Sequence, residues 1–219
     1  MTGKGQHVLL LVGSPKGLEK AQSARLGRVV LDGLEKRGWT SESIHLHEAV
    51  RSDDGRRDLV ASVARASVVV FSAPLYVDSL PAPAIRALEL IAEHRPVETG
   101  NVPRFVSIVN CGFVEPSQND TCQRILQQFA ERAGLEWMRG VSIGSGGGTT
   151  RRVRTAFDIL VEALDLEILV PDEVERLTRK PVMPRWLYIL GGNVMWRRQA
   201  AKNGVKDRLR DRPYERRGS

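Results

Sequence analysis

The fold of this chain is decided by the stretch Val68-Val-Val-Phe-Ser-Ala-Pro-Leu-Tyr-Val-Asp-Ser-Leu-Pro81. It begins as an apolar run of strand character, which is predicted to stop at Ser72. A tight loop centred on Pro74 and Tyr76 follows, and a helix is predicted over Pro83–Glu93. In open α/β sheets, ligands bind in the loops that follow the carboxyl ends of the strands. The stretch therefore predicts an α/β fold with a ligand loop that carries an aromatic side chain.

The same order of strand, loop and helix occurs near the beginning of the chain. An apolar run, Val8–Val12, precedes Gly13-Ser-Pro-Lys16, and a helix is predicted to open near Ser23. Small residues let the backbone approach an anion, and a helix N-terminus adds free N–H groups and the positive end of its dipole. Ser14 and Ser23 can supply hydroxyl groups, and Lys16 can supply a positive charge. The two loops together predict a ligand with a phosphate at one end and a ring at the other.

The first loop lacks the two best-known phosphate signatures, because it has neither the Gly-Lys-Ser/Thr end of a Walker A sequence nor a GxGxxG fingerprint. A second interpretation is therefore an ordinary βα loop in which Ser23 caps the helix. Nucleophilic catalysis is not indicated either. Ser14 and Ser72 have no histidine or carboxylate that the sequence pairs with them, so no catalytic side chain is expected.

Strands and helices alternate along the first two thirds of the chain. Short connections between them predict βαβ units and a parallel sheet, and right-handed crossovers put helices on both of its faces. The second strand is mixed in polarity, as an edge strand should be, whereas the first, third and fourth are nearly all apolar. The predicted strands are Val8–Val12, Ser43–His47, Ser67–Ser72, Arg104–Asn110 and Glu136–Ile143, and the predicted helices are Ser23–Arg37, Arg56–Arg65, Pro83–Glu93, Asn119–Ala133 and Arg152–Leu164.

The composition is that of a folded soluble protein, with 42% hydrophobic and 27% charged residues. The only apolar run near the start, Val8–Val12, is too short for a signal peptide or a membrane span, so a cytoplasmic location is expected. Cys111 and Cys122 are expected to be reduced thiols. His45 and His47 share one face of the predicted second strand, but no further ligand joins them, so no metal is expected.

Three segments together resemble the ligand loops of flavodoxin-like NAD(P)H-dependent FMN reductases, a group that includes NAD(P)H:quinone oxidoreductases. They are Gly13-Ser-Pro-Lys16 with Ser23, Ala73-Pro-Leu-Tyr-Val-Asp-Ser-Leu-Pro81 and Asn110-Cys-Gly-Phe-Val-Glu-Pro116. The resemblance covers residues 7 to about 148 in the same order. It implies a flavodoxin-like three-layer sandwich, with a five-stranded parallel sheet in the order 2-1-3-4-5 and FMN at the carboxyl edge of the sheet.

The resemblance also implies an activity: a hydride passes from NADH or NADPH through bound FMN to a quinone, a free flavin or a similar small acceptor. The alternative is a flavodoxin-like FMN-binding electron-transfer protein that acts on a protein partner. Carried over to this chain, the FMN-binding residues are Ser14, Lys16, Gln22 and Ser23 at the phosphate, Pro74, Leu75, Tyr76 and Val77 along the isoalloxazine, and Asn110, Cys111, Gly112 and Phe113 at the far edge of the ring.

Some of these assignments have alternatives. Many of the resembled proteins have arginine in place of Lys16 and asparagine in place of Gln22, and lysine lacks the bidentate fork of arginine. Tyr76 can be a neighbour of the ring or a core residue, and Cys111 can likewise be a small core residue. Gly144–Thr150 either lines the nicotinamide side of the site or is a flexible exit into the next helix.

The C-terminal part of the chain differs from the rest. Residues 176–219 hold 13 Lys and Arg against 3 Asp and Glu, whereas residues 1–175 hold 20 against 23. This basic tail predicts contact with nucleic acid, a membrane surface or an acidic partner, or else a solvated helix. We expect an FMN-binding domain at residues 1–170 and a helical extension at 171–219, in which Gly191 and Gly192 interrupt the helix that begins at Pro184.

The extension also carries more large apolar side chains than a lone solvated helix tolerates, because each is worth roughly 1.5–3 kcal/mol when buried. The parent domain, a second subunit or a membrane surface must cover them, and the adjacent lysines and arginines would suit anionic lipid. Because the resembled proteins commonly form dimers or tetramers, we expect a homo-oligomer, with membrane contact as an alternative and no nucleic acid partner. The apolar residues are Trp186, Leu187, Ile189, Leu190, Val194, Met195 and Trp196.

Overall fold

A computed structural model of the chain describes residues 6–95 and 102–211. The chain divides into two compact units, Met1–Val182 and Met183–Ser219. A five-stranded parallel sheet forms the centre of the first unit, with the strands in the order β2-β1-β3-β4-β5. The predicted fold class, strand order and flavodoxin-like architecture are therefore confirmed.

The strands follow the apolar runs of the sequence. Those in the middle of the sheet are almost completely buried, whereas β2 is mostly half-buried, as expected of an edge strand. β3 continues beyond its predicted end at Ser72, because Ala73 and Pro74 pair with Val109 and Asn110 of β4. The strand bounds are His7–Val12 for β1, Thr40–His45 for β2, Val68–Pro74 for β3, Arg104–Asn110 for β4 and Glu136–Ile143 for β5.

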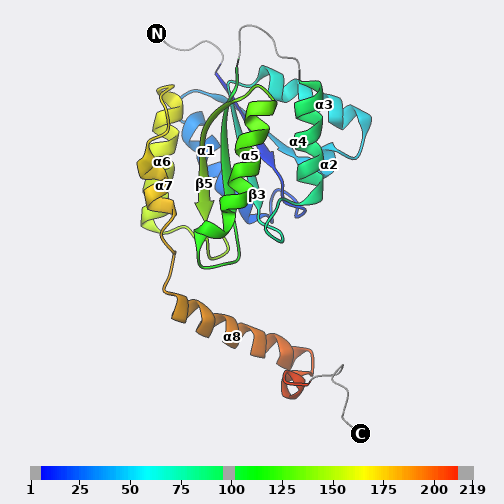
Figure 1. The fold of residues 1–219 in the computed structure, drawn as a ribbon, viewed down its shortest axis with the longest axis vertical. Coiled ribbons are helices and arrows are strands. Elements are labelled where there is room, and N and C mark those ends of the chain that lie inside the picture. The colour runs from blue at the N-terminus through cyan, green and yellow to red at the C-terminus, as the bar shows by residue number, and fades with distance from the viewer. Residues whose placement is uncertain (1–5, 96–101, 212–219) are drawn as a thin grey trace. The chain divides into compact units, whose positions relative to one another are not determined.

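Helices cover both faces of the sheet and make it the middle of three layers (Figure 1). Alternate strand residues point to opposite faces. Leu10 and Val70 therefore pack with α1 (Gln22–Glu35) and α6 (Arg151–Asp165). Leu9 and Phe71 pack on the other side. The helices of that second layer are α2 (Leu46–Ala49), α3 (Asp53–Arg65), α4 (Ala82–His94) and α5 (Asp120–Arg132), the last preceded by the short helix η1 (Pro116–Asn119).

The second strand and the histidines after it differ from the prediction. The strand was expected over Ser43–His47, but β2 ends at His45 and the chain turns at once into α2. The side chain of Leu46 is fully buried in the core between the sheet and the layer of α2 to α5, and this burial anchors the turn. His45 and His47 therefore do not share a strand face, since His47 belongs to α2.

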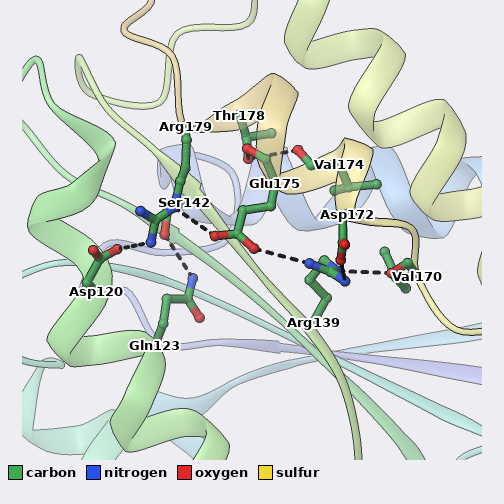
Figure 2. Close-up of polar contacts among 10 residues, drawn as sticks. All are labelled: Asp120, Gln123, Arg139, Ser142, Val170, Asp172, Val174, Glu175, Thr178 and Arg179. Atoms are coloured by element: carbon green, nitrogen blue, oxygen red, sulfur yellow. Dashed lines mark hydrogen bonds and ion pairs between the residues drawn. The ribbon is translucent and has the colours of Figure 1, made fainter.

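Arg139 of the edge strand β5 holds the helix α7 (Asp172–Thr178) against the sheet (Figure 2). Its Nε atom donates to the carbonyl oxygen of Val170 over 2.9 Å, and the guanidinium also pairs with the carboxylates of Asp172 and Glu175. Because α7 packs on α6 and β5, it belongs to the first unit. The first unit thus extends to Val182, beyond the boundary at residue 170 expected from the sequence.

The second unit consists of α8 (Arg185–Lys202) and the short helix η2 (Lys206–Arg208). The predicted interruption at Gly191 and Gly192 is wrong, because α8 runs through both residues. Glycine costs about 1 kcal/mol relative to alanine inside a helix, which weakens the helix but does not forbid it. Across the described residues, no helix combines the length and the hydropathy that a membrane crossing requires.

Candidate ligand site at the carboxyl edge of the sheet

Loops from four strands gather at the carboxyl edge of the sheet, and hydrogen bonds join neighbouring strand ends there. The N–H of Gly13 donates to the carbonyl of Ser72 over 2.9 Å, and that of Leu75 donates to Asn110 over 2.8 Å. The N–H of Cys111 donates to Ile143 over 3.0 Å. All twelve residues predicted for the site lie on these loops or on the strand and helix ends beside them.

The N-terminus of α1 is open. Helix α1 begins at Gln22, and its N-cap residue, Ala21, has no side chain that can accept a hydrogen bond. By contrast, α3 and α6 are capped by the hydroxyls of Ser52 and Thr150. The interpretation of Ser23 as an N-cap is wrong, since Ser23 lies in the first helical turn. Because the first N–H groups of a helix have no intrahelical partner, an uncapped N-terminus can bind an anion.

Ser23 adds an unpaired polar atom at this end of α1. Its side chain is 2% exposed, and its Oγ atom has no hydrogen-bond partner among the described residues. The first turn of α1 contains no acidic residue that would repel an anion. A buried hydroxyl without a partner is unfavourable, so the position suits a ligand oxygen that would accept a hydrogen bond from it.

The loop before α1 is held by Ser14 and carries the free charge of Lys16. Ser14 is 3% exposed, and its Oγ atom accepts from the N–H of Lys16 over 3.1 Å. The carbonyl oxygen of Ser14 accepts from Nε2 of His45 over 2.7 Å, a positioning contact that the sequence did not reveal. The side chain of Lys16 is exposed, and no carboxylate of the described residues pairs with it. Its charge therefore remains available to a ligand.

Gln22 joins the start of α1 to the loop after β5. Its Nε2 atom donates to the carbonyl of Gly147 over 2.8 Å. Gly147 has a φ of +86°, and a Cβ atom there would lie 2.7 Å from Cγ of Gln22, so this position requires glycine. In the described structure the side-chain N–H of Gln22 thus braces the site.

The loop after β3 ends in a tight turn that exposes its aromatic residue. Tyr76 and Ser79 exchange two backbone hydrogen bonds of 2.8 and 3.0 Å. The residues between them, Val77 and Asp78, both have positive φ, as in a type I′ turn. Val77 is 99% exposed and Tyr76 is 44% exposed. Tyr76 is therefore not a core residue, and its ring is free to contact a ligand.

Val77 adopts a conformation that a β-branched residue rarely takes, with a φ of +48°. Such strain persists only where the surrounding structure imposes it, and it concentrates at functional sites. Leu75, one position before Tyr76, is half-buried and packs against the core on the α2 to α5 side of the sheet. Pro74 pairs with Asn110 at the end of β3. The turn is thus anchored by Pro74 and Leu75, and its tip projects into solvent.

The third loop is packed against the loop after β5. The N–H of Ser145 donates to the carbonyl of Phe113 over 2.5 Å, and that of Gly146 donates to Cys111 over 2.8 Å. Gly112 and Phe113 are exposed, and Phe113 keeps 52% of its surface in solvent. The segment Gly144–Thr150 is therefore tied to the third loop by backbone hydrogen bonds.

Three further polar atoms at this edge are buried without a partner among the described residues. They are Oδ1 of Asn110, Oδ1 of Asn119 and Oγ of Ser145. Sequence reasoning named Asn110 as a site residue, included Ser145 in the alternative that Gly144–Thr150 lines the site, and missed Asn119. Asn119 precedes α5, and its Nδ2 atom donates to the carbonyl of Val109 over 3.2 Å. The only available signal for Asn119 was its place just beyond the third loop.

Cys111 lies beside these atoms but is a structural thiol. It is 1% exposed, and its sulfur contacts the carbonyl oxygens of Phe113 and Glu115 at 3.8 and 3.7 Å. Burial raises the pKa of the Cys111 thiol above its ordinary value, so the thiol stays protonated at neutral pH. Its side chain therefore packs as a small apolar group.

A hollow lies elsewhere, between α3 and α4. It has a volume of about 870 Å³ and contains none of the predicted site residues. Four arginines line it, and each is paired with a carboxylate: Arg56 with Asp53, Arg57 with Asp54, Arg65 with Glu42 and Arg86 with Glu89. Because these charges are already neutralised, the hollow has less to offer an anionic ligand than the carboxyl edge.

The carboxyl edge thus combines two kinds of surface. An open helix N-terminus, two serine hydroxyls and a free lysine lie on the loop and helix after β1. Exposed aromatic rings, Tyr76 and Phe113, lie on the loops after β3 and β4, with unpaired polar atoms beside them. This arrangement can hold a phosphate and a planar ring. No cluster of three His, Cys, Asp or Glu side chains suited to a metal ion occurs within residues 6–95 and 102–211.

The protein has the flavodoxin-like fold, and several solved oxidoreductases share it. NADH:FMN oxidoreductase (EMOB), in its apo form, matches with a TM-score of 0.58 and 15% identity over 82% of this chain and 97% of its own. NAD(P)H:quinone oxidoreductase from Methanothermobacter marburgensis matches with a TM-score of 0.55 and 15% identity over 74% of this chain and 96% of its own.

An FMN-dependent NADH-azoreductase from Bacillus anthracis, solved in complex with FMN, matches with a TM-score of 0.52 and 14% identity. This match covers 79% of this chain and 99% of the azoreductase. No protein-family model matches the chain, and no curated protein matches it in sequence. The likeness to these three enzymes therefore rests on the fold, which is the one that the sequence resemblance implied.

Proposed function

We propose that the protein binds one FMN at the carboxyl edge of the sheet and is an NAD(P)H-dependent FMN reductase. It passes a hydride from NADH or NADPH through the flavin to a quinone, a free flavin or a similar small acceptor, and it works in the cytoplasm. The observation that carries this proposal is the open N-terminus of α1 with the buried, unpaired hydroxyl of Ser23. The fold shared with three NAD(P)H-dependent oxidoreductases supports it.

The phosphate end of the site is assigned to the loop and helix after β1. The free N–H groups of the first turn of α1 and the hydroxyl of Ser23 would donate to the phosphate oxygens. Lys16 supplies the positive charge, and Ser14 shapes the loop through its bond to the N–H of Lys16. Lysine acts here as a point charge without the two-pronged geometry of arginine, so the grip on the phosphate is weaker than an arginine would give.

The ring end is assigned to the loops after β3 and β4. FMN held here would supply the hydride transfer between the nicotinamide and the acceptor, so no catalytic nucleophile is required of the protein. Tyr76 and Phe113 offer exposed aromatic surface that would cover the ring and exclude water from it. The oxygen of Asn110 and the hydroxyl of Ser145 have no hydrogen-bond partner among the described residues, so they would be available to polar atoms of the ring.

The charge of the first unit favours an enzyme over an electron carrier. Flavodoxin-like carriers tend to be strongly acidic, whereas residues 1–182 hold 23 basic and 23 acidic side chains. A neutral surface lacks the steering field that draws a charged protein partner. Small-molecule acceptors need no such field. Self-association of the chain stays a prediction.

The proposal is tested by reconstitution and reduction. Purified protein is loaded with FMN, desalted, and examined for a flavin spectrum at one FMN per chain. Anaerobic addition of NADH or NADPH should then rapidly bleach the yellow colour of the oxidised flavin. Addition of a quinone should restore that colour. Loss of both FMN and FAD on desalting would overturn the proposal. Stable FMN that neither nucleotide bleaches would favour the electron carrier.

A further inference from the structure

Helix α8 of the second unit exposes large apolar side chains along its first three turns. Trp186 is 67% exposed and Trp196 is 65% exposed. Of all the residues of α8, only Ala200 is buried. A contiguous apolar surface of this kind marks a contact site for a partner or a membrane. The other exposed apolar residues are Leu187, Ile189, Leu190, Val194 and Met195.

These apolar side chains surround the helix axis. At about 100° per residue, Met195 lies about 180° from Trp186, and Leu187 and Ile189 fall on the two sides between them. No charged residue occurs between Trp186 and Trp196. A helix that packs into a protein groove normally keeps a polar face toward water. This segment has no such face, so an apolar medium suits it better than a groove on one side.

The charge of the second unit indicates that the apolar medium carries negative charge at its surface. Residues 183–219 hold ten Lys and Arg against three Asp and Glu, which equals the whole formal net charge of +7 of the chain. Arg185 directly precedes Trp186. The other basic residues begin directly after Trp196, at Arg197 and Arg198, and continue through Lys202 into η2. Lys and Arg next to an apolar helical segment are the pattern that binds anionic lipid headgroups.

The length of the apolar segment decides how it meets a bilayer. From Trp186 to Trp196 the helix rises about 15 Å, at 1.5 Å per residue, whereas the hydrocarbon core is about 30 Å thick. The segment is therefore too short to cross the core and can only lie along one leaflet. Tryptophans stand at both of its ends, and the tryptophan ring prefers the boundary between headgroups and acyl chains.

We infer that the second unit docks the protein on an anionic membrane surface, with the Trp186–Trp196 segment in the headgroup boundary of one leaflet and the basic residues after it on the lipid phosphates. This goes beyond the proposed reductase activity and does not depend on it. Acyl chains and headgroups together contact sides of the segment that a single protein groove would leave exposed. It also neutralises a charge that a second copy of this basic unit would repel.

The first test is vesicle flotation with the full-length protein, without added flavin. The protein should float with vesicles of equal phosphatidylcholine and phosphatidylglycerol but not with phosphatidylcholine alone, and added salt should weaken binding. Arg197→Gln with Arg198→Gln should weaken it about 25-fold, at about fivefold per charge. The matched control is Lys36→Gln with Arg51→Gln, which removes two exposed charges of the first unit and should leave binding unchanged.

The second test measures insertion. Lipids brominated in their acyl chains should quench the tryptophan emission of the wild-type protein. Trp186→Phe with Trp196→Phe should bind the same vesicles but lose the quenching, because Trp39 is buried and Trp137 packs against the core. Leu190→Ser should weaken binding, whereas Leu169→Ser, at a 69% exposed leucine of the first unit, should not.

Three results would overturn the inference. One is a wild-type protein that ignores anionic vesicles. Another is vesicle binding that neither the arginine pair nor Leu190→Ser weakens, which would assign the binding to another surface. The third is a dimer in sedimentation that Leu190→Ser converts to a monomer, without vesicle binding by either form. That result would assign the apolar segment to a second copy of the chain.

Discussion

The side-chain amide of Gln22, the first residue of α1, donates a hydrogen bond of 2.8 Å to the carbonyl of Gly147 in the loop after β5. The two residues are 125 positions apart in the chain. This contact links the helix that follows β1 to the loop that follows the far edge strand. It therefore closes one side of the candidate site before any ligand binds.

We expect Gln22→Ala to loosen this side of the site. A neutral hydrogen bond contributes about 1 kcal/mol, so FMN should bind about fivefold more weakly. Amide hydrogen exchange in the loop after β5 should also rise in the ligand-free protein. Gln127→Ala is the matched control, because Gln127 is an exposed α5 residue whose side chain donates a 3.5 Å bond to Glu131 within the same helix. Unchanged exchange at Gly147 in Gln22→Ala would contradict this prediction.

Lys16→Ala should weaken FMN binding about ten- to a hundredfold, because a hydrogen bond to a charged group contributes about 1.5–3 kcal/mol. Riboflavin, which has no phosphate, should lose little affinity. Lys20→Ala serves as the control, since Lys20 is an exposed lysine of the same loop. Fluorescence titration of both ligands measures the effect. Equal losses for FMN and riboflavin would place the phosphate elsewhere.

Ser72→Ala should lower the stability of the protein, whereas Ser23→Ala should weaken FMN binding without lowering stability. The hydroxyl of Ser72 is buried and donates to the carbonyl of Ser23 over 2.7 Å, so its removal should cost about 1 kcal/mol of unfolding free energy. The hydroxyl of Ser23 has no partner, so Ser23→Ala should leave the stability of the ligand-free protein unchanged or raise it. Ser23→Ala should instead weaken FMN binding about tenfold. Denaturant unfolding and flavin titration separate the two effects, and a destabilised Ser23→Ala would contradict the assignment.

Cys122 should make the protein less stable at alkaline pH. Burial in α5 raises its pKa to about 12 from an ordinary 9.0. Below pH 9.0 the thiol is neutral in both states, so stability does not change with pH. Above that value the unfolded thiol ionises and the folded one does not, so the unfolding free energy falls by up to about 1.4 kcal/mol per pH unit until about pH 12.

The comparison with Cys122→Ala isolates this effect from lysine and tyrosine titration. Denaturant unfolding is measured from about pH 8 to about pH 10.5, a window that spans the ordinary thiol pKa. The stability difference between wild type and Cys122→Ala should shrink as the pH rises. Two curves that stay parallel throughout the window would show that the Cys122 thiol ionises normally in the folded protein.

The strands themselves were predictable because each depends on a pattern within a short window, whereas their order in the sheet was implied by the resemblance to FMN reductases. Apolar runs such as Val8–Val12 and Val68–Val70 mark buried parallel strands, and the helices between them follow from periodicity. The prediction failed where such a pattern was ambiguous, as at Ser43–His47. There the burial of Leu46 by distant residues turns the chain into α2.

The sequence by itself determined the α/β fold and the split between a neutral domain and a basic, apolar tail, because each depends on patterns among neighbouring residues. The three ligand loops were implied by the resemblance, and their ligand stays a prediction. Only the tertiary structure decided that Ser23 is unpaired, that Gln22 reaches Gly147 and that His45 holds the carbonyl of Ser14. It also decided that α8 continues through its two glycines. The physical reason is that a hydrogen bond, or its absence, depends on which distant segments the packed core brings within about 3 Å, and no local pattern records that.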